Sequence, residues 1–229
     1  MPSSAWRVHA TLATVALFFG LSYYWTKELV QALPDPAWPL AWCAVRVTTS
    51  AALLAGIALV LGRWRLPRAT VLKLAGLAVF GVVLNQICFI VGMRHTTPTQ
   101  SALINLAIPV ATLAFSRILG HERLGWRKVV GIGLALSGVA SLLLPRAAGE
   151  VPHWKGNALT FVNAISFAVF LTLSRPLMRG KGSATDPIAA TAWVFLFGTL
   201  GIDAVGFGSL RSAQERSFRV SRATISARP

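Results

Sequence analysis

Apolar stretches of about 20 residues alternate with short polar connections along most of this chain, as far as residue 208. A helix rises 1.5 Å per residue, so about 20 apolar residues can cross the ~30 Å hydrocarbon core of a bilayer. The pattern predicts an all-α integral membrane protein with about seven transmembrane helices. The predicted segments are 9–30, 39–61, 72–93, 99–119, 128–144, 157–177 and 188–208.

The amino-acid composition also indicates that the protein lies in a lipid bilayer. Hydrophobic residues make up 55% of the chain and charged residues 13%, against about 25% charged residues in soluble domains. The net charge of +15 would suit a nucleic-acid-binding protein, but the basic residues gather at alternate segment ends rather than on one face.

This alternation predicts the orientation. One set of segment ends holds Arg7, Arg63, Arg65, Arg68, Lys73, Arg117, Arg123, Arg127, Lys128, Arg175, Arg179 and Lys181; the other set holds Lys27, Arg94, Arg146 and Lys155. Because the basic ends of membrane helices stay on the cytoplasmic side, the N-terminus is expected in the cytoplasm.

An internal similarity appears when the chain is offset by 148 residues. The first two segments then align without a gap on the sixth and seventh, pairing Phe19 with Phe167, Lys27 with Arg175 and Pro39 with Pro187. Five helices separate the copies, and an odd number inverts the second copy in the membrane. Inverted repeats are a recurring plan of secondary transporters, with the substrate site near the midplane.

The residues after 208 break this pattern. They contain five arginines and no apolar run, and an arginine at the centre of a bilayer-spanning helix costs several kcal/mol. Residues 209–229 are therefore expected to form a basic, disordered tail.

The motifs of residues 84–144 resemble those of the EamA-type members of the drug/metabolite transporter superfamily. The resemblance rests on the Asn85-Gln86 pair, the Thr-rich turn at 96–99, the run from Ala102 to Pro109, the Gly-x-Glu-Arg-Leu turn at 120–124, and the glycine-rich stretch 131–138. Phe19-Gly20 with Lys27, and Arg46, are similar to motifs of the family's first two helices.

The resemblance implies ten helices in two inverted five-helix repeats. It also implies an exporter of metabolites or drugs in the bacterial inner membrane, working by alternating access. Residues 9–144 would be the first repeat, 145–208 two helices of the second, and 209–229 the tail. A chain without the last three helices is expected to be inactive, or to need a dimer or a partner that supplies them.

Five residues are the candidates for a substrate cavity: Arg46, Asn85, Gln86, Asn105 and Pro109. Arg46 lies within an apolar segment, where a charge faces the bundle interior or snorkels to the interface. Asn85 and Gln86 would either line a cavity or hydrogen-bond between helices. Pro109 should free the carbonyl of Asn105 and leave a polar notch in mid-helix.

Other functions have less support from the sequence. A non-transporting seven-helix scaffold or partner-binding protein remains open, with the basic tail as its binding element. An enzyme is not expected, because no acidic pair, nucleophile or metal-ligand spacing was found; no cofactor is expected either. Asp203 is the one carboxylate deep in an apolar segment, as proton coupling would need. The spacing of Ala52 with Gly56, and of Gly131, Gly133 and Gly138, predicts close helix contacts.

Overall fold

The structure is a computed structural model, which describes residues 3–33, 35, 37–120, 125–127, 129–134, 137, 154–179 and 185–226. It is an all-α, multi-pass membrane protein. The helices are α1 (Ser3–Ala32), α2 (Ala37–Val60), α3 (Arg68–Ala78), the π-helix η1 (Val79–Leu84), α4 (Asn85–Arg94), α5 (Pro98–Ile104), α6 (Ala107–Ile118), α8 (Trp154–Arg179) and α9 (Pro187–Ser226).

Within these described residues, five helical spans are long and apolar enough to cross a membrane. They are Ala37–Val60, Arg68–Arg94, Pro98–Ile118, Trp154–Met178 and Pro187–Ser217. The first predicted segment is also helical, but polar residues such as His9 and Ser22 interrupt the apolar run of α1. Most of the predicted segment 128–144 lies outside the described residues, with 129–134 and 137 helical.

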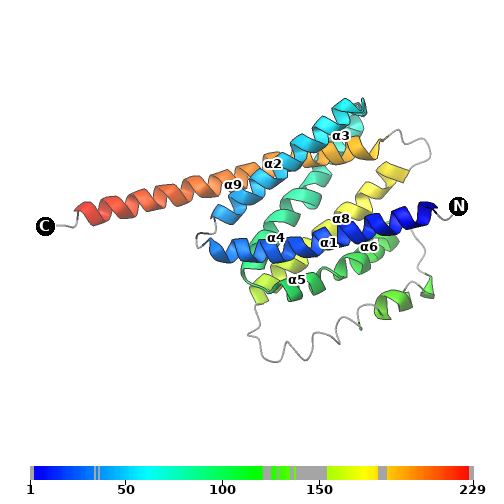
Figure 1. Cartoon of the computed structure of the whole chain (residues 1–229), viewed down its shortest axis with the longest axis horizontal. Helices are drawn as coiled ribbons and strands as arrows, with labels where there is room; N and C mark the ends of the chain where they lie inside the picture. The colour runs from blue at the N-terminus through cyan, green and yellow to red at the C-terminus, as the bar shows by residue number, and fades with distance from the viewer. Residues whose placement is uncertain are drawn as a thin grey trace.

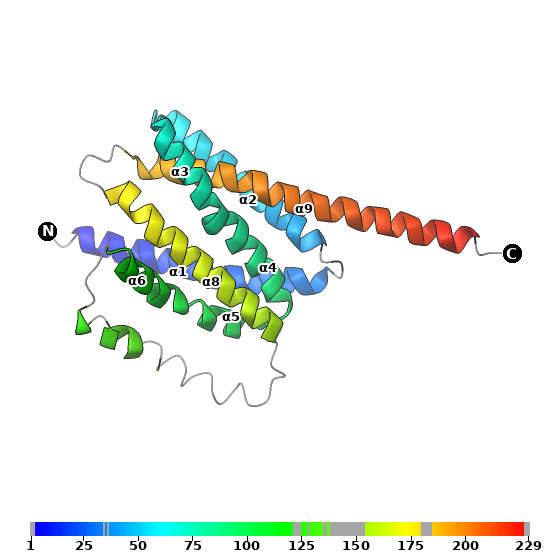
Figure 2. The same ribbon diagram turned by 180° about the vertical axis from the view of Figure 1, so that it is seen from behind.

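The repeated helices run in opposite directions. Figures 1 and 2 show α1 antiparallel to α8, and α2 antiparallel to α9, with α2 and α9 packed side by side. Arg63, just after α2, lies 3.5 Å from the carboxylate of Asp186, just before α9, so these two ends share one side of the bundle. This is the arrangement that the inverted offset of 148 residues predicts.

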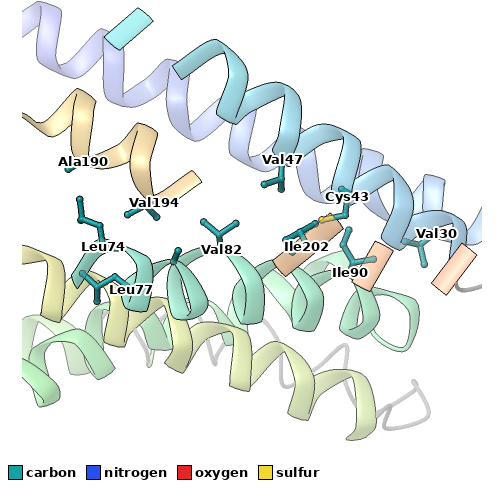
Figure 3. Packing of buried hydrophobic residues seen from close by; sticks show 12 residues of the cluster. Val30, Cys43, Val47, Leu74, Leu77, Val82, Ile90, Ala190, Val194 and Ile202 are labelled. Carbon is teal, nitrogen blue, oxygen red and sulfur yellow. The ribbon is translucent and has the colours of Figure 1, made fainter. Parts of the chain in front are cut away.

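A tight apolar core joins α2, α9 and the rod formed by α3, η1 and α4. Cys43 and Val47 of α2, Val82 of η1 and Val194 and Ile202 of α9 are buried together there (Figure 3). Cys43 and Cys88 are both buried and form no disulfide, so these thiols pack as small side chains inside the bundle. By contrast Val60, Leu72 and Ile118 are more than two-thirds exposed, as lipid-facing residues would be.

Side chains of α8 hydrogen-bond to the rod where the π-helix widens it. Ser166 Oγ donates to the carbonyl of Phe80 at 2.7 Å, and Asn163 Nδ2 donates to the carbonyl of Asn85 at 2.7 Å. A π turn departs from the usual hydrogen-bond ladder, and backbone groups inside a membrane need partners within the protein. The polar residues of α8 supply one such partner within η1, at Phe80, and one directly after it, at Asn85.

The C-terminal end of α4 is a meeting point for three helices. Lys27 Nζ of α1 donates to the carbonyls of Met93 at 3.0 Å and Thr96 at 2.7 Å. The hydroxyl of Thr96 donates to Asn157 Oδ1 of α8 at 2.6 Å. Gly156 lies against the backbone of His95, so close that even a methyl group would overlap it. Lys27 therefore caps a helix end rather than standing in solvent.

The end of α9 corrects one expectation. Residues 209–226 continue the helix instead of forming a disordered tail, and Figure 1 shows this part projecting beyond the bundle. The stretch contains no glycine or proline, and Arg211, Glu215 and Arg219 follow the i, i+4 spacing that supports a helix. Extending an existing helix costs less free energy than nucleating a new one, so the basic stretch continues the helix of the membrane span.

Candidate functional site

A cavity of about 470 Å³ lies between the first helices of the chain and the α8–α9 pair. We call it the central cavity. Its walls come from α1, α2, η1, α4, α6, α8 and α9, together with the turn between α5 and α6. The volume falls within the ~300–1,000 Å³ typical of small-molecule sites. Four of the five predicted site residues line it: Arg46, Asn85, Gln86 and Asn105.

Arg46 bonds to Gln86 across the helices. It lies nine residues after the start of α2, about 14 Å along the helix axis and close to the middle of a ~30 Å bilayer core. Its Nη2 donates to Gln86 Oε1 at 2.6 Å. This contact decides the open alternative for Arg46 in favour of a hydrogen bond inside the bundle.

Asn85 also lines this cavity, but its contact with a neighbouring helix is made by the backbone. Its backbone carbonyl accepts the hydrogen bond from Asn163, and the residue lines the cavity next to Gln86. The adjacent pair thus contacts two neighbours: Gln86 reaches α2, and the backbone of Asn85 reaches α8. The two alternatives for this pair, cavity lining and helix–helix bonding, are both realised.

Asn105 lies in a real helix break. The chain leaves the α-helix at Asn105 and Leu106, between α5 and α6. Asn105 Nδ2 donates to Tyr23 Oη at 2.6 Å, while Asn105 Oδ1 is buried with no hydrogen-bond partner among the described residues. This oxygen can accept a hydrogen bond from a ligand in the cavity.

The expectation that Pro109 frees the carbonyl of Asn105 is wrong. The carbonyl of Asn105 is not left unpaired by Pro109, because the amide of Ile108 donates to it at 3.0 Å in a tighter turn. Pro109 itself does not line the central cavity; it borders a separate hollow of about 580 Å³ beside Thr112, Ser116 and Arg175.

The residue pattern did not predict the aromatic lining of the cavity or the role of Tyr23 in it. Phe19, Tyr23, Phe89, Phe167, Phe170 and Phe195 all line the central cavity. Tyr23 and Phe89 meet edge to face with their centroids 5.2 Å apart, and Phe167 stacks on Phe170 at 5.8 Å. The internal similarity at an offset of 148 residues could have indicated part of this lining, because it pairs Phe19 with Phe167.

Further pairs at the same offset meet in the cavity. Ser22 and Phe170, Tyr23 and Leu171, and Arg46 and Val194 are each 148 residues apart, and all six residues line it. Equivalent positions of two antiparallel helix pairs thus face one another across a single space. The lining is also asymmetric, because an arginine on α2 faces a valine on α9.

The side chains that line this cavity are of types that bind small molecules. Hydroxyls, amides, one guanidinium and aromatic faces can orient a small molecule and exclude lipid from it. Asp203, the carboxylate considered for proton coupling, lies elsewhere: the hydroxyl of Thr48 donates to it, at 2.9 Å from Oδ1 and 3.2 Å from Oδ2.

Comparisons with known proteins agree with this architecture. Residues 6–144 match the model of the EamA-like transporter family. An "Uncharacterized transporter" of Archaeoglobus fulgidus is 30% identical over 193 residues, covering 82% of this chain and 63% of that protein. "Uncharacterized transporter YetK" of Bacillus subtilis is 33% identical over 123 residues, covering 52% of this chain and 36% of that protein.

A WAT1-related protein of Arabidopsis thaliana is 24% identical over 156 residues, covering 57% of this chain and 41% of that protein. The matched regions thus span less than two thirds of each of these relatives. No solved structure matches the chain significantly. The family match covers more than half of the chain and includes α1 to α6, which supply Tyr23, Arg46, Gln86 and Asn105 to the cavity. The chain belongs to the EamA-like transporter family.

Proposed function

We propose that this protein carries a small organic solute across the membrane, with the central cavity as the substrate site. The observation that carries the proposal is the pairing of positions 148 residues apart around one cavity near mid-membrane. Inverted repeats that enclose a site at the midplane can rock against each other and open it to either side in turn. The names of the relatives support the same class of function.

The repeats and their placement complete the proposal. Residues 9–144 form the first repeat and 145–208 begin the second, in a bacterial inner membrane with the N-terminus in the cytoplasm. The twelve-to-four distribution of basic residues supports this orientation. The direction of transport is outward, an inference supported by the family resemblance alone.

Filling the cavity tests the proposal. A Cβ added at Gly81 would lie 2.6 Å from the ring of Phe170, so a Gly81→Leu side chain must occupy space in the cavity. Proteoliposomes loaded with a mixture of small metabolites should release a subset of them faster than protein-free vesicles, as followed by mass spectrometry. We expect Gly81→Leu to reduce this release to the protein-free rate.

Gly76→Leu is the matched control, because Gly76 is exposed on the same rod with nothing within 4 Å of its added Cβ. It should release the same solutes as the original chain. Thr191→Trp provides a second blocked variant if Gly81→Leu does not fold, since Thr191 lines the cavity from α9 and is only partly buried. Undiminished release by a folded blocked variant would contradict the site. The absence of protein-dependent release would contradict transport by this chain alone and would fit either the non-transporting scaffold or a chain that needs a partner.

A further inference from the structure

We infer that the central cavity selects an organic anion with an aromatic or flat apolar body, and discriminates against cations of the same shape. This inference rests on the proposed function, since it names the substrate class of that site. The argument starts from the charge balance of the cavity. Among the described residues that line it, Arg46 is the one charged side chain.

No carboxylate balances this charge in the described part of the chain. The one ion pair found there joins Arg63 to Asp186, outside the central cavity. Asp203 accepts its hydrogen bonds from Thr48 and does not line the cavity. Glu28 borders a different hollow, of about 680 Å³, which Arg46 also borders, and it forms no ion pair with Arg46 among the described residues. A charge in the membrane interior is costly and is normally paired. An anionic ligand would supply the missing counter-charge.

The hydrogen bond to Gln86 leaves Arg46 able to bind such a ligand. A guanidinium carries five N–H donors in a planar fork, and the hydrogen bond to Gln86 Oε1 uses one of its three nitrogens, Nη2. Gln86 presents a neutral acceptor, so it orients the fork without cancelling its charge. A carboxylate matches the fork with two parallel hydrogen bonds, which favours it over a rounder anion.

The aromatic residues that line the cavity indicate which uncharged group the ligand carries. The rings of Phe19 and Tyr23 of α1 and Phe89 of α4 line the cavity together with those of Phe167 and Phe170 of α8 and Phe195 of α9. Aromatic rings prefer offset-stacked or edge-to-face neighbours, so an aromatic ligand gains contacts that a hydrated sugar does not. The combination of one cation and six rings fits a small aryl carboxylate.

A matched series of three probes tests the inference by binding alone. The probes are 3-phenylpropionate, 3-phenylpropionamide and 3-phenylpropylammonium, which share a phenyl body and differ in charge. Titration calorimetry on the purified chain in lipid nanodiscs, with empty nanodiscs subtracted, should show the anion binding about ten- to hundredfold more tightly than the amide. The ammonium should bind more weakly still.

Variants of Arg46 assign the selectivity to this side chain. Arg46→Gln should bring the affinity for the anion down to that of the amide, while Arg46→Lys should retain part of the preference. Arg46→Lys also keeps the charge if the glutamine variant does not fold. Arg63→Gln, at an exposed arginine outside the cavity, should bind as the original chain does.

Equal affinity for anion and amide, an unchanged preference in folded Arg46→Gln, or no binding of any probe would each overturn the inference. Its failure is distinguishable from failure of the proposed function. Protein-dependent release of neutral or cationic solutes, blocked by Gly81→Leu, would keep the transporter and remove the anion preference. Selective anion binding without any release of solutes would keep the anion preference and contradict the proposed transport.

Discussion

Gly156→Ala should destabilise the protein by about 3 kcal/mol or prevent its folding, a large effect for the addition of one methyl group. The added Cβ would overlap the carbonyl carbon and oxygen of His95 and lie 2.8 Å from the amide nitrogen of Thr96. These are backbone atoms, so no rotamer change can relieve the overlap. The start of α8 would have to move away from α4, which also stretches the bond between Thr96 and Asn157. Thermal unfolding in detergent, followed by helical circular dichroism, measures the loss.

Gly56→Ala is the matched control for this prediction. Gly56 lies within α2 with nothing within 4 Å of its added Cβ, so the substitution only changes helix propensity. We expect it to be neutral or stabilising by up to about 1 kcal/mol. If the two variants were equally stable, the close approach of α8 to the end of α4 would be wrong.

Lys27→Met should cost about 2–3 kcal/mol, the second-largest effect that we expect. The lysine amine donates to the carbonyls of Met93 and Thr96, and methionine keeps the length of the side chain while removing both donors. Carbonyls at a helix C-terminus have no partner in their own helix and favour a nearby cation. Chemical unfolding in mixed micelles would compare the variant with the original chain.

Lys73→Met controls for the loss of a positive charge, because Lys73 is exposed on α3. It should change stability by less than about 0.5 kcal/mol. Lys27→Arg should recover part of the loss, since a guanidinium can donate to the same carbonyls from a bulkier group. An unchanged unfolding midpoint for Lys27→Met would show that the cap contributes nothing to stability.

Much of the fold could be predicted because a bilayer restricts the solutions. Helix length and apolarity are direct requirements of crossing the membrane, so within the described residues the predicted segments coincide with helices, apart from the break at Asn105 and Leu106 and single residues at segment ends. The segment 9–30 shows the limit of this reasoning. It is helical, but α1 is not among the five spans that satisfy both length and apolarity.

The polar half of the site was predictable and the apolar half was not. Arg46, Gln86 and Asn105 are conspicuous in an apolar segment, and a polar group there needs an internal partner or a cavity. Phe170 and Phe195 are not conspicuous, because a phenylalanine facing lipid and one facing a cavity look alike in sequence. Separating them needs the rotation of each helix about its axis.

Glycines show the same limit. The spacing of Ala52 and Gly56 predicted a close helix contact, which is wrong for the part of the chain that the structure describes: both residues are exposed, and none of the described residues lies within 4 Å of a Cβ added at Gly56. The close approaches occur instead at glycines without a marked spacing, such as Gly156 against His95 and Gly198, whose added Cβ would lie 2.5 Å from Val82. A spacing rule shows which residues share a face, but it does not show which face meets a neighbour.

The π-helix at Val79–Leu84 has a consequence for changes in chain length. Deleting one residue from an α-helix rotates everything beyond it by about 100°. A π turn holds about one residue more than an α turn, so a deletion within η1 can convert it to an α turn and leave both flanks in their original orientation. Gln86 would still face Arg46 after such a deletion, whereas loss of Leu72 from α3 would turn Gln86 away. This rod therefore has one point, at the level of the cavity, where its length and its register are independent.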